Sequence, residues 1–174
     1  MWRTHLIGGI ASLVAALPFT GVAEPVPLLL FAMLGSLLPD LDASESHIKH
    51  LSLGTKVEPF LLPSQIIHRA LGHRGLLHSL WGVVLLATVS GVPLGYYFGV
   101  SAGVGLVLGY ASHLLLDAMT KTGIPLLYPN RLRFHLLPKG WRVITGSMEE
   151  DLCFGLLAAA SLFVLFFLLV PRSV

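Results

Sequence analysis

The sequence predicts an all-α fold: a polytopic membrane helix bundle of about five transmembrane or re-entrant helices, with a metal site at one membrane face. Hydrophobic residues make up 55% of the 174 residues and charged residues only 11%, against about 25% charged in a typical soluble domain. The mean hydropathy is +0.81. Five apolar runs, separated by turns that contain proline, glycine or charge, carry this composition. The length fits a single domain over residues 1–174.

The first two apolar runs, residues 6–17 and 26–38, are short and are followed by Pro18 and Pro39. A helix of 12 or 13 residues spans only about 20 Å, against about 30 Å of hydrocarbon in a bilayer. These runs therefore either cross a thinned bilayer or enter and return as a re-entrant hairpin. The first run also has the basic start and apolar stretch of a signal peptide, although its charged region is weak.

The three later runs cover residues 76–89, 94–117 and 152–170. We expect a turn at residues 91–94, because Gly91 and Pro93 follow the third run. The fourth run is rich in glycine, and Gly105 and Gly109 are four residues apart on one helix face. Small residues at this spacing let membrane helices approach closely.

The charged residues indicate how the bundle is oriented. If the runs alternate in direction, the N-terminus and the loops 39–75 and 118–151 lie on one side of the membrane. That side receives ten of the eleven Lys and Arg residues, all eight histidines and eight of the nine acids. Positively charged loops stay in the cytoplasm, so this side is predicted to be cytoplasmic.

The stretch from Gly109 to Thr120 reads as the end of an apolar helix and contains His113 and Asp117. Four residues apart, the two side chains share one helix face and can bind one metal ion together. A carboxylate is costly in an apolar membrane helix, so its presence there favours a functional role. The alternative is that Asp117 balances a basic patch while His113 bonds to a carbonyl.

Two further acids, Asp40 and Asp42, follow the second apolar run. Pro39 disfavours a helical conformation for Leu38, so both acids lie where a helix has just ended. Acids at that end oppose the helix dipole, which favours metal ligation over capping. The alternative for Asp42 is the N-cap of a following helix.

His73 lies just before the third run and His78 lies at its start, with Arg74 and Gly75 between them. Five residues apart, the two histidines would diverge by about 140° on a regular helix, but Gly75 permits a bend that lets both converge. The alternative is that only one of them binds metal. The Arg74 guanidinium can bind a phosphate through two parallel hydrogen bonds; its alternative is an interfacial charge.

His5 and Glu150 complete the set of candidate ligands. His5 begins the first run on the same membrane side, and without the other ligands it would be a histidine at the headgroup level. Glu150 opens the last run beside Glu149 and Asp151. There the alternative is strong, because acids at a helix N-terminus favour the dipole and Ser147 with Glu150 matches a capping box. The single cysteine excludes a multi-cysteine metal site.

Four motifs occur in order: Leu-Pro-Asp40-Leu-Asp42, His73-Arg-Gly-x-x-His78-Ser, His113-Leu-x-Leu-Asp117 and Thr-Gly-Ser-x-x-Glu150. Together they resemble the YdjM-like bacterial inner-membrane proteins, described as membrane-bound metal-dependent hydrolases. That family is distantly similar to the zinc-dependent phospholipase C and single-strand nuclease superfamily. The resemblance implies a helical, multi-metal phosphoesterase site whose ligands are His5, Asp40, Asp42, His73, His78, His113, Asp117 and Glu150. The N-terminal tryptophan ligand of the soluble relatives is not carried over to Trp2.

The expected function is a hydrolase in the bacterial inner membrane, multi-pass, with its site facing the cytoplasm. Two or more divalent ions, with zinc expected, would activate a water molecule. Asp42, Arg74 and Glu150 are the predicted catalytic residues, and Arg131 or Arg133 would help to bind phosphate. At the headgroup level, the natural substrate is a membrane lipid phosphoester or a lipid-linked phosphate, and we expect no nucleic-acid partner.

Two alternatives from other classes remain. The first is a metal-binding membrane protein without turnover, such as a regulator or an envelope-assembly factor. The second is an ion transporter, which needs ionisable residues near mid-membrane on several helices. The clustering of ionisable residues at helix ends on one side counts against a transporter.

Overall fold

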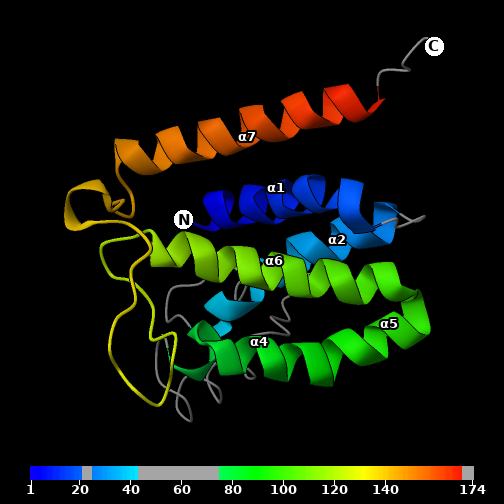
Figure 1. Ribbon diagram of the computed structural model, residues 1–174, viewed down its shortest axis with the longest axis horizontal. Coiled ribbons are helices and arrows are strands. Elements are labelled where there is room, and N and C mark those ends of the chain that lie inside the picture. The colour runs from blue at the N-terminus through cyan, green and yellow to red at the C-terminus, as the bar shows by residue number, and fades with distance from the viewer. Residues whose placement is uncertain (21–24, 43–74, 170–174) are drawn as a thin grey trace, which may run out of the picture.

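The structure is a computed structural model that describes residues 1–20, 25–42 and 75–169, and the side chains of residues 1–17, 25–40 and 75–166. The described residues form helices that run along one common direction (Figure 1) and include no β-strand, so the all-α prediction is confirmed for this part of the chain. The α-helices are α1 (Trp2–Thr20), α2 (Pro25–Gly35), α4 (Leu80–Leu86), α5 (Val92–Phe98), α6 (Val100–Ala118) and α7 (Met148–Leu169). Short helices are η1 (Leu38–Asp42), η3 (Leu76–His78), the π-helix η4 (Ala87–Gly91) and η5 (Lys139–Trp141).

Helix α6 is the centre of the bundle. It packs against α1, α2, α5 and η4, while α7 packs on the outer side of α1 (Figure 1). Most residues of α6 are buried, because neighbours cover it on several sides. The helix that carries His113 and Asp117 is therefore the one best shielded from solvent and lipid.

Glycines bring α6 and α2 into close contact. A Cβ atom at Gly105 or Gly109 would overlap the backbone carbonyl of Leu28 or Ala32 on α2, and Gly35 meets α6 in the same way. The prediction that glycines four residues apart permit close helix packing is confirmed. This contact fixes the end of α2, and with it the start of η1, beside the C-terminal half of α6.

The prediction of a turn at residues 91–94 is wrong. Helices α4, η4 and α5 form one continuous helical stretch, Leu80–Phe98. Pro93 lacks an N–H, but it follows a π-helical turn in which the Val92 N–H bonds to the Ala87 carbonyl, so the wider turn accommodates it. The chain turns instead at Gly99, whose φ of 88° is readily adopted only by glycine.

The first helix is also longer than predicted. Helix α1 has 19 residues and continues past Pro18 to Thr20, so at about 1.5 Å per residue it is about 28 Å long. Pro18 lies in the last turn, where its missing N–H removes only one helical hydrogen bond. Helix α2, with 11 residues, is short as predicted, at about 16 Å.

Within the part of the chain that the structure describes, two helical stretches are long and apolar enough to cross a membrane: Leu80–Phe98 and Val100–Ala118. The first exposes large apolar side chains, among them Trp81, Val84 and Val89. Helix α7 likewise exposes Phe163 and Phe166. An exposed apolar surface of this extent is typical of a protein that contacts lipid.

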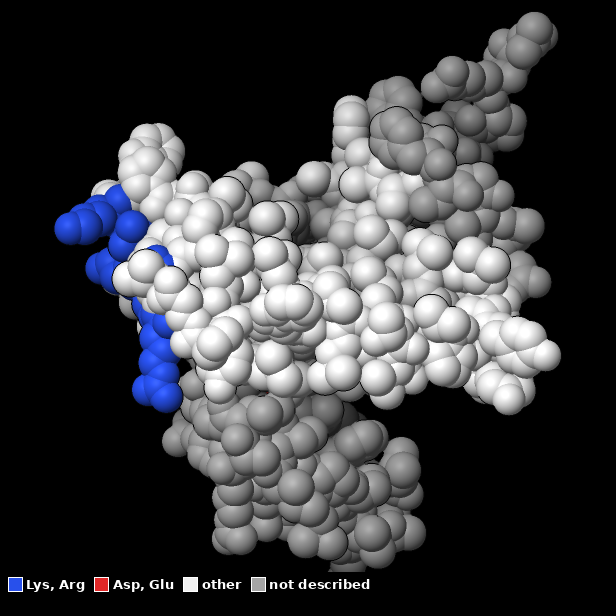
Figure 2. Space-filling view, turned by 60° about the horizontal axis from the view of Figure 1, so that its bottom comes forward, with Lys and Arg blue, Asp and Glu red and all other residues white. Residues whose placement is uncertain are grey.

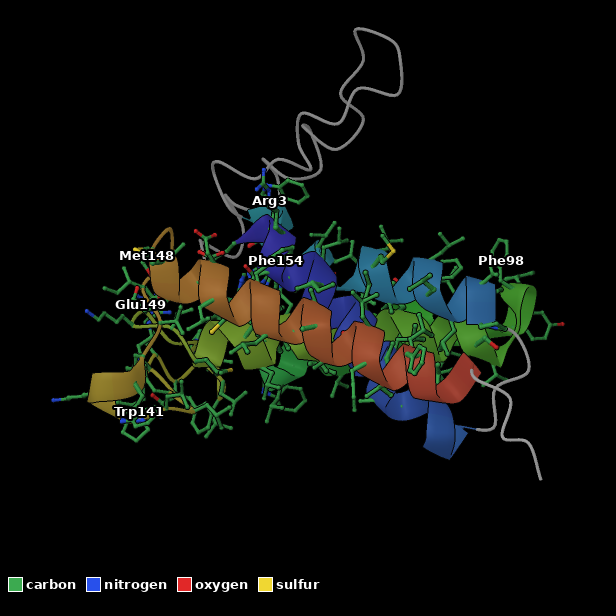
Figure 3. The ribbon with its side chains drawn as sticks, turned by 90° about the horizontal axis from the view of Figure 1, so that it is seen from above. Arg3, Phe98, Trp141, Met148, Glu149 and Phe154 are labelled. Carbon is green, nitrogen blue, oxygen red and sulfur yellow. The ribbon has the colours of Figure 1, made fainter. Side chains whose placement is uncertain are left out.

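The loop between α6 and α7, residues 119–147, folds over the end of the bundle that holds the site. The Leu136 N–H donates to the Ala118 carbonyl at 2.8 Å, and the Leu80 N–H donates to the Leu126 carbonyl at 3.0 Å, so the loop ties α6 to α4. It contains no acid, and its cations gather at one end of the molecule (Figure 2): Lys121, Arg131, Arg133, Lys139 and Arg142. Trp141 and Met148 lie at that end, opposite Phe98 (Figure 3).

Candidate metal centre

Five candidate ligands from four separate elements meet at this end of the bundle. His5 lies in the first turn of α1, Asp40 in η1, His78 at the end of η3, and His113 and Asp117 one turn apart on α6. The three histidines and Asp117 are at most 1% exposed, whereas the Asp40 side chain is 25% exposed. The sequence-based expectation that distant polar residues converge on His113 and Asp117 therefore agrees with the structure for these five.

The Asp117 carboxylate lies among the three imidazole rings. Its Oδ1 is 3.5 Å from His5 Nε2, and its Oδ2 is 3.6 Å from His78 Nε2 and 3.9 Å from His113 Nε2. Asp40 Oδ1 is 3.8 Å from His113 Nε2. These separations exceed the roughly 2.7–3.2 Å of a hydrogen bond. They approach the roughly 3.3 Å that separates two ligands each about 2.0–2.1 Å from a tetrahedral zinc ion.

The backbone carbonyl of Ser36 orients His113. It lies 2.7 Å from His113 Nδ1, and because a carbonyl only accepts hydrogen bonds, Nδ1 carries the proton. The Nε2 lone pair then points at the carboxylates, and Nε2 makes no hydrogen bond within the described residues. Histidines that bind metals typically donate their other N–H to a carbonyl or carboxylate in this way.

The Ser36 carbonyl is available because α2 ends there. The Ser36 N–H still bonds to the Ala32 carbonyl at 3.0 Å, but the last carbonyls of a helix have no partner within the helix. The His113 ring satisfies one of them. The contact between α2 and α6 thus sets the distance between this carbonyl and the imidazole that it orients.

His78 is positioned by Tyr110, which lies one turn before His113 on α6. The Tyr110 hydroxyl donates to the carbonyl of Leu77 and so fixes η3 against α6. Directly after His78, the Ser79 hydroxyl caps α4 by accepting the Gly82 N–H at 3.4 Å. The His78 and His113 rings then meet edge to face, with their centroids 5.3 Å apart.

Atoms of these residues form two groups that could each hold a metal ion. One group is His5, Asp40 and His113, and the other is His78, His113 and Asp117; within each, the ligand atoms lie within 4.8 Å of one another. Buried histidine and carboxylate side chains at this spacing are the donors that zinc and related ions bind. The residues present therefore fit a divalent ion.

Three of the predicted residues cannot be placed against this centre. The backbone of Asp42 ends η1, but its side chain lies outside the described residues, as do His73 and Arg74 entirely. Their roles as ligands or catalytic groups stay predictions. Arg131 and Arg133 are exposed in the loop that covers this end of the bundle.

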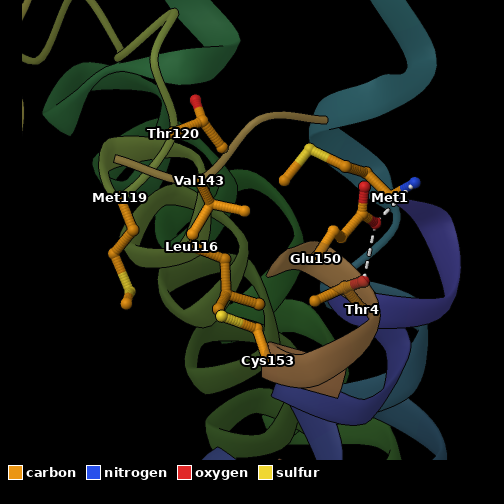
Figure 4. Close-up of a pocket in the computed structure, with 8 residues that line it drawn as sticks. All are labelled: Met1, Thr4, Leu116, Met119, Thr120, Val143, Glu150 and Cys153. Carbon is orange, nitrogen blue, oxygen red and sulfur yellow. Dashed lines mark hydrogen bonds and ion pairs between the residues drawn. The ribbon is translucent and has the colours of Figure 1, made fainter. Parts of the chain in front are cut away.

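Glu150 belongs to neither candidate group, and Figure 4 shows it beside Met1 and Thr4. Its Oε1 accepts the Thr4 hydroxyl at 2.7 Å and lies 2.9 Å from the Met1 amino nitrogen, and its Oε2 accepts the Gly146 N–H at 2.7 Å. Burial raises the pKa of Glu150, but these donors lower it further, so the pKa lies below its ordinary value.

These contacts match the capping alternative for Glu150, except that the backbone donor is not the one a capping box uses. The capping box predicted its bond to the N–H of Ser147, whereas the donor is Gly146, one residue earlier, and the Ser147 hydroxyl donates to the Ile144 carbonyl. The positive φ of Gly146, 81°, belongs to this local turn. The metal and catalytic roles of Glu150 stay predictions that its described contacts do not support.

Comparison with known proteins identifies the family. The model of the family "YdjM inner membrane protein" matches residues 1–172. This chain belongs to that family. "Uncharacterized protein YvsG" of Bacillus subtilis (strain 168) is 34% identical over 170 residues, which are 98% of this chain and 97% of that protein. "Inner membrane protein YdjM" of Escherichia coli (strain K12) is 46% identical over 107 residues, 60% of this chain and 50% of that protein.

A third relative, "Uncharacterized protein ORF4" of Methanothermobacter thermautotrophicus, is 32% identical over 99 residues, 54% of this chain and 38% of that protein. No solved structure is significantly similar to the chain. The family and the two apolar helical stretches together indicate a protein of the inner membrane. The resemblance to YdjM-like proteins that the sequence motifs predicted is thereby confirmed.

Proposed function

We propose that this protein is a membrane-embedded metal-dependent hydrolase that cleaves a phosphoester of a lipid or lipid-linked phosphate at the cytoplasmic face. One observation carries the proposal: the Asp117 carboxylate lies 3.5–3.9 Å from three histidine nitrogens at the end of an apolar helix. Ionisable residues are rare in membrane helices and usually mark a functional site there. The bundle would use about five transmembrane or re-entrant helices to hold this site at one face.

Zinc is the proposed ion, held by His78, His113 and Asp117 or by His5, Asp40 and His113. Nitrogen and carboxylate ligands without sulfur suit zinc in catalytic sites. His113 offers only Nε2, because Nδ1 is bonded to a carbonyl, so it cannot serve both groups at once. A second ion therefore requires further ligands, for which the predicted residues Asp42 and His73 are the candidates.

When bound, such an ion lowers the pKa of a coordinated water towards about 7 and offsets the charge of a phosphate. The chain supplies the remaining functions. Asp40 is the most exposed of the five converging residues, while the buried carboxylate of Asp117 lies among the histidines. Arg74, Arg131 and Arg133 are the proposed phosphate-binding cations, and Asp42 is the proposed catalytic acid. The contacts of Glu150 with Thr4 and Gly146 favour a structural role for that predicted catalytic residue.

The proposed orientation rests on the loop of residues 119–147, which carries five cations and no acid at the end of the bundle that holds the site. Positively charged loops face the cytoplasm. A site at this level lies beside the phosphates of the inner leaflet, which is why a lipid phosphoester is the proposed substrate.

The test uses purified protein and two matched variants. His113→Ala removes the shared ligand, and Ser112→Ala changes a neighbouring buried residue whose hydroxyl bonds only its own helix, at the Gly109 carbonyl. We expect His113→Ala to lose bound zinc and to lower hydrolysis of dioleoyl phosphatidylglycerol by about 100-fold or more. Ser112→Ala should retain both. Full zinc content or unchanged turnover in His113→Ala would overturn the proposal.

One observation favours the second candidate, a metal-binding membrane protein without turnover. Four of the five converging residues are at most 1% exposed, and a closed coordination shell is typical of structural metal sites. This candidate predicts bound metal without hydrolysis of any phosphoester in a broad panel, and a fall in stability when the metal is removed.

A further inference from the structure

An apolar groove lies beside the metal centre, between the continuous helical stretch α4–η4 and helix α6. Its volume is about 270 Å³, close to the lower end of the roughly 300–1,000 Å³ of small-molecule sites. The lining comes from five elements (η1, η3, α4, η4 and α6) and is almost wholly apolar; it includes Leu38, Leu77, Gly82, Leu85, Val89 and Tyr110.

The inner end of the groove adjoins the candidate ligands. Leu77 immediately precedes His78, and Tyr110 lies one turn before His113 on α6. Leu38 lines the groove two residues before Asp40. A molecule that fills the groove therefore ends next to the side chains that we propose to bind the metal.

The outer end of the groove opens on a surface of the proposed membrane-spanning stretch. Leu85 is 45% exposed and Val89 is 64% exposed, so both line the groove and also face outward. A surface of this kind contacts hydrocarbon in a membrane protein. Water has few polar partners in such a groove, where Ser90 supplies one of the few hydroxyl groups.

We propose that this groove holds one hydrocarbon tail of the lipid whose phosphate is bound at the metal centre. Binding of the phosphate at the metal centre rests on the proposed function, whereas binding of the tail rests on the groove itself. A tail that enters from the bilayer would lie along α4 and place its headgroup end beside His78 and Asp40. The groove thus selects a lipid phosphoester over a water-soluble one.

A larger apolar pocket of about 510 Å³ lies between α5, η4 and α6, lined by Gly95, Gly103 and Val104 among others. None of the five converging residues lines it, and it lies towards the Gly99 turn. A lipid there would contact none of these five. The position beside the ligands, rather than the size, therefore identifies the groove as the substrate-binding part.

The test fills the groove and measures bound lipid without relying on turnover. Leu85→Trp and Val89→Trp place an indole in the groove, while Val84→Trp is the matched control, because Val84 is 52% exposed on the same helix and does not line the groove. Each protein is reconstituted with dioleoyl phosphatidylglycerol, extracted in detergent and examined by native mass spectrometry. Zinc content, measured in parallel, reports whether the metal centre has survived.

We expect wild type and Val84→Trp to retain one lipid per chain, and the two groove variants to lower this occupancy by about tenfold or more. Leu85→Gln, paired with Val84→Gln, repeats the comparison without added bulk, in case an indole disturbs folding. No retained lipid in wild type, or equal retention in groove and control variants, would overturn the proposal.

Turnover separates this inference from the proposed function. On dioleoyl phosphatidylglycerol the groove variants should lose about tenfold or more in kcat/KM, and on the short-chain dibutyryl lipid they should match wild type. If lipid retention depends on the groove but no lipid is hydrolysed, the proposed hydrolase fails and the tail site stands. If lipid retention is equal in all variants while hydrolysis proceeds, only the tail site fails.

Discussion

Two carboxylates are buried at the same end of the bundle, and their surroundings differ. Glu150 has donors at hydrogen-bond distance: the Thr4 hydroxyl and the Gly146 N–H, each at 2.7 Å. Asp117 has three histidine nitrogens around it, but at 3.5–3.9 Å. The first spacing is that of hydrogen bonds, whereas the second exceeds it and approaches the separation of two ligands on one zinc ion.

This difference separates a structural acid from a candidate ligand. The donors of Glu150 are contributed by the chain itself and join the start of α7 to the start of α1, so Glu150 stabilises the fold without a bound ion. The Asp117 carboxylate, with Asp40 nearby, brings negative charge into a buried group of histidines. Histidine and carboxylate side chains grouped in this way are the donors that a divalent cation such as zinc binds.

The largest expected effect on zinc binding comes from neutralising the Asp117 carboxylate. Asp117→Asn keeps the size of the side chain but removes its charge, so zinc affinity should fall by about 100-fold or more. Asp151→Asn is the matched control, because Asp151 is an exposed acid in the first turn of α7. Zinc titration of both variants makes the comparison, and equal affinity would show that Asp117 is not a ligand.

Metal removal should lower the stability of the folded protein. With free zinc at about 1,000 times the Kd, binding adds about 4 kcal/mol to the stability of the folded state. A chelator should therefore lower the Tm of wild type in detergent and leave that of Asp117→Asn almost unchanged. If the chelator lowers the Tm of both proteins equally, the stabilising ion does not bind at Asp117.

Removing a contact of Glu150 should lower the stability of the fold without changing zinc binding. Thr4→Val removes the 2.7 Å hydrogen bond to Glu150 and should lower the free energy of unfolding by about 1.5–3 kcal/mol. Zinc content should not change. Thr88→Val is the control, since the Thr88 hydroxyl is exposed and bonds only carbonyls of its own helical stretch. Loss of zinc in Thr4→Val would mean that Glu150 belongs to the metal centre after all.

The smallest expected effect is that the stabilising contribution of the Glu150 charge decreases as the pH falls. The folded-state pKa of Glu150 lies below the ordinary value of 4.5, so its contribution to stability is present above that value and is lost as the pH falls through the folded-state pKa. Unfolding of metal-free wild type and Glu150→Gln should therefore differ most near neutral pH and converge in acid. A difference that grows as the pH falls would contradict this assignment of the Glu150 charge.

Much of the candidate site could be predicted from local sequence patterns. His113 and Asp117 are four residues apart on an apolar helix, and Asp40 and His78 each border an apolar run, so their types and positions already indicated chemistry. The role of His5 depended on packing, because only the contact of α1 with α6 brings its ring to stack on His113, with centroids 3.7 Å apart.

Other features depend on the three-dimensional fold and leave little trace in the sequence. The orienting group for His113 is the backbone carbonyl of Ser36, which no side-chain pattern reveals. Pro93 suggested a helix end because the π-turn that accommodates it has no simple sequence signal. The position of Tyr110, one turn before His113 on the same helix, was a clue that its hydroxyl supports the site. Its partner, the Leu77 carbonyl in η3, could not be inferred from the sequence.

A structure of the zinc-loaded protein, solved with anomalous scattering at the zinc edge, tests the central claim most directly. We expect an anomalous peak about 2.0–2.2 Å from His113 Nε2 and from an Asp117 or Asp40 oxygen. Full zinc occupancy at any other place, with His113 and Asp117 in their present positions and no peak between them, would contradict it.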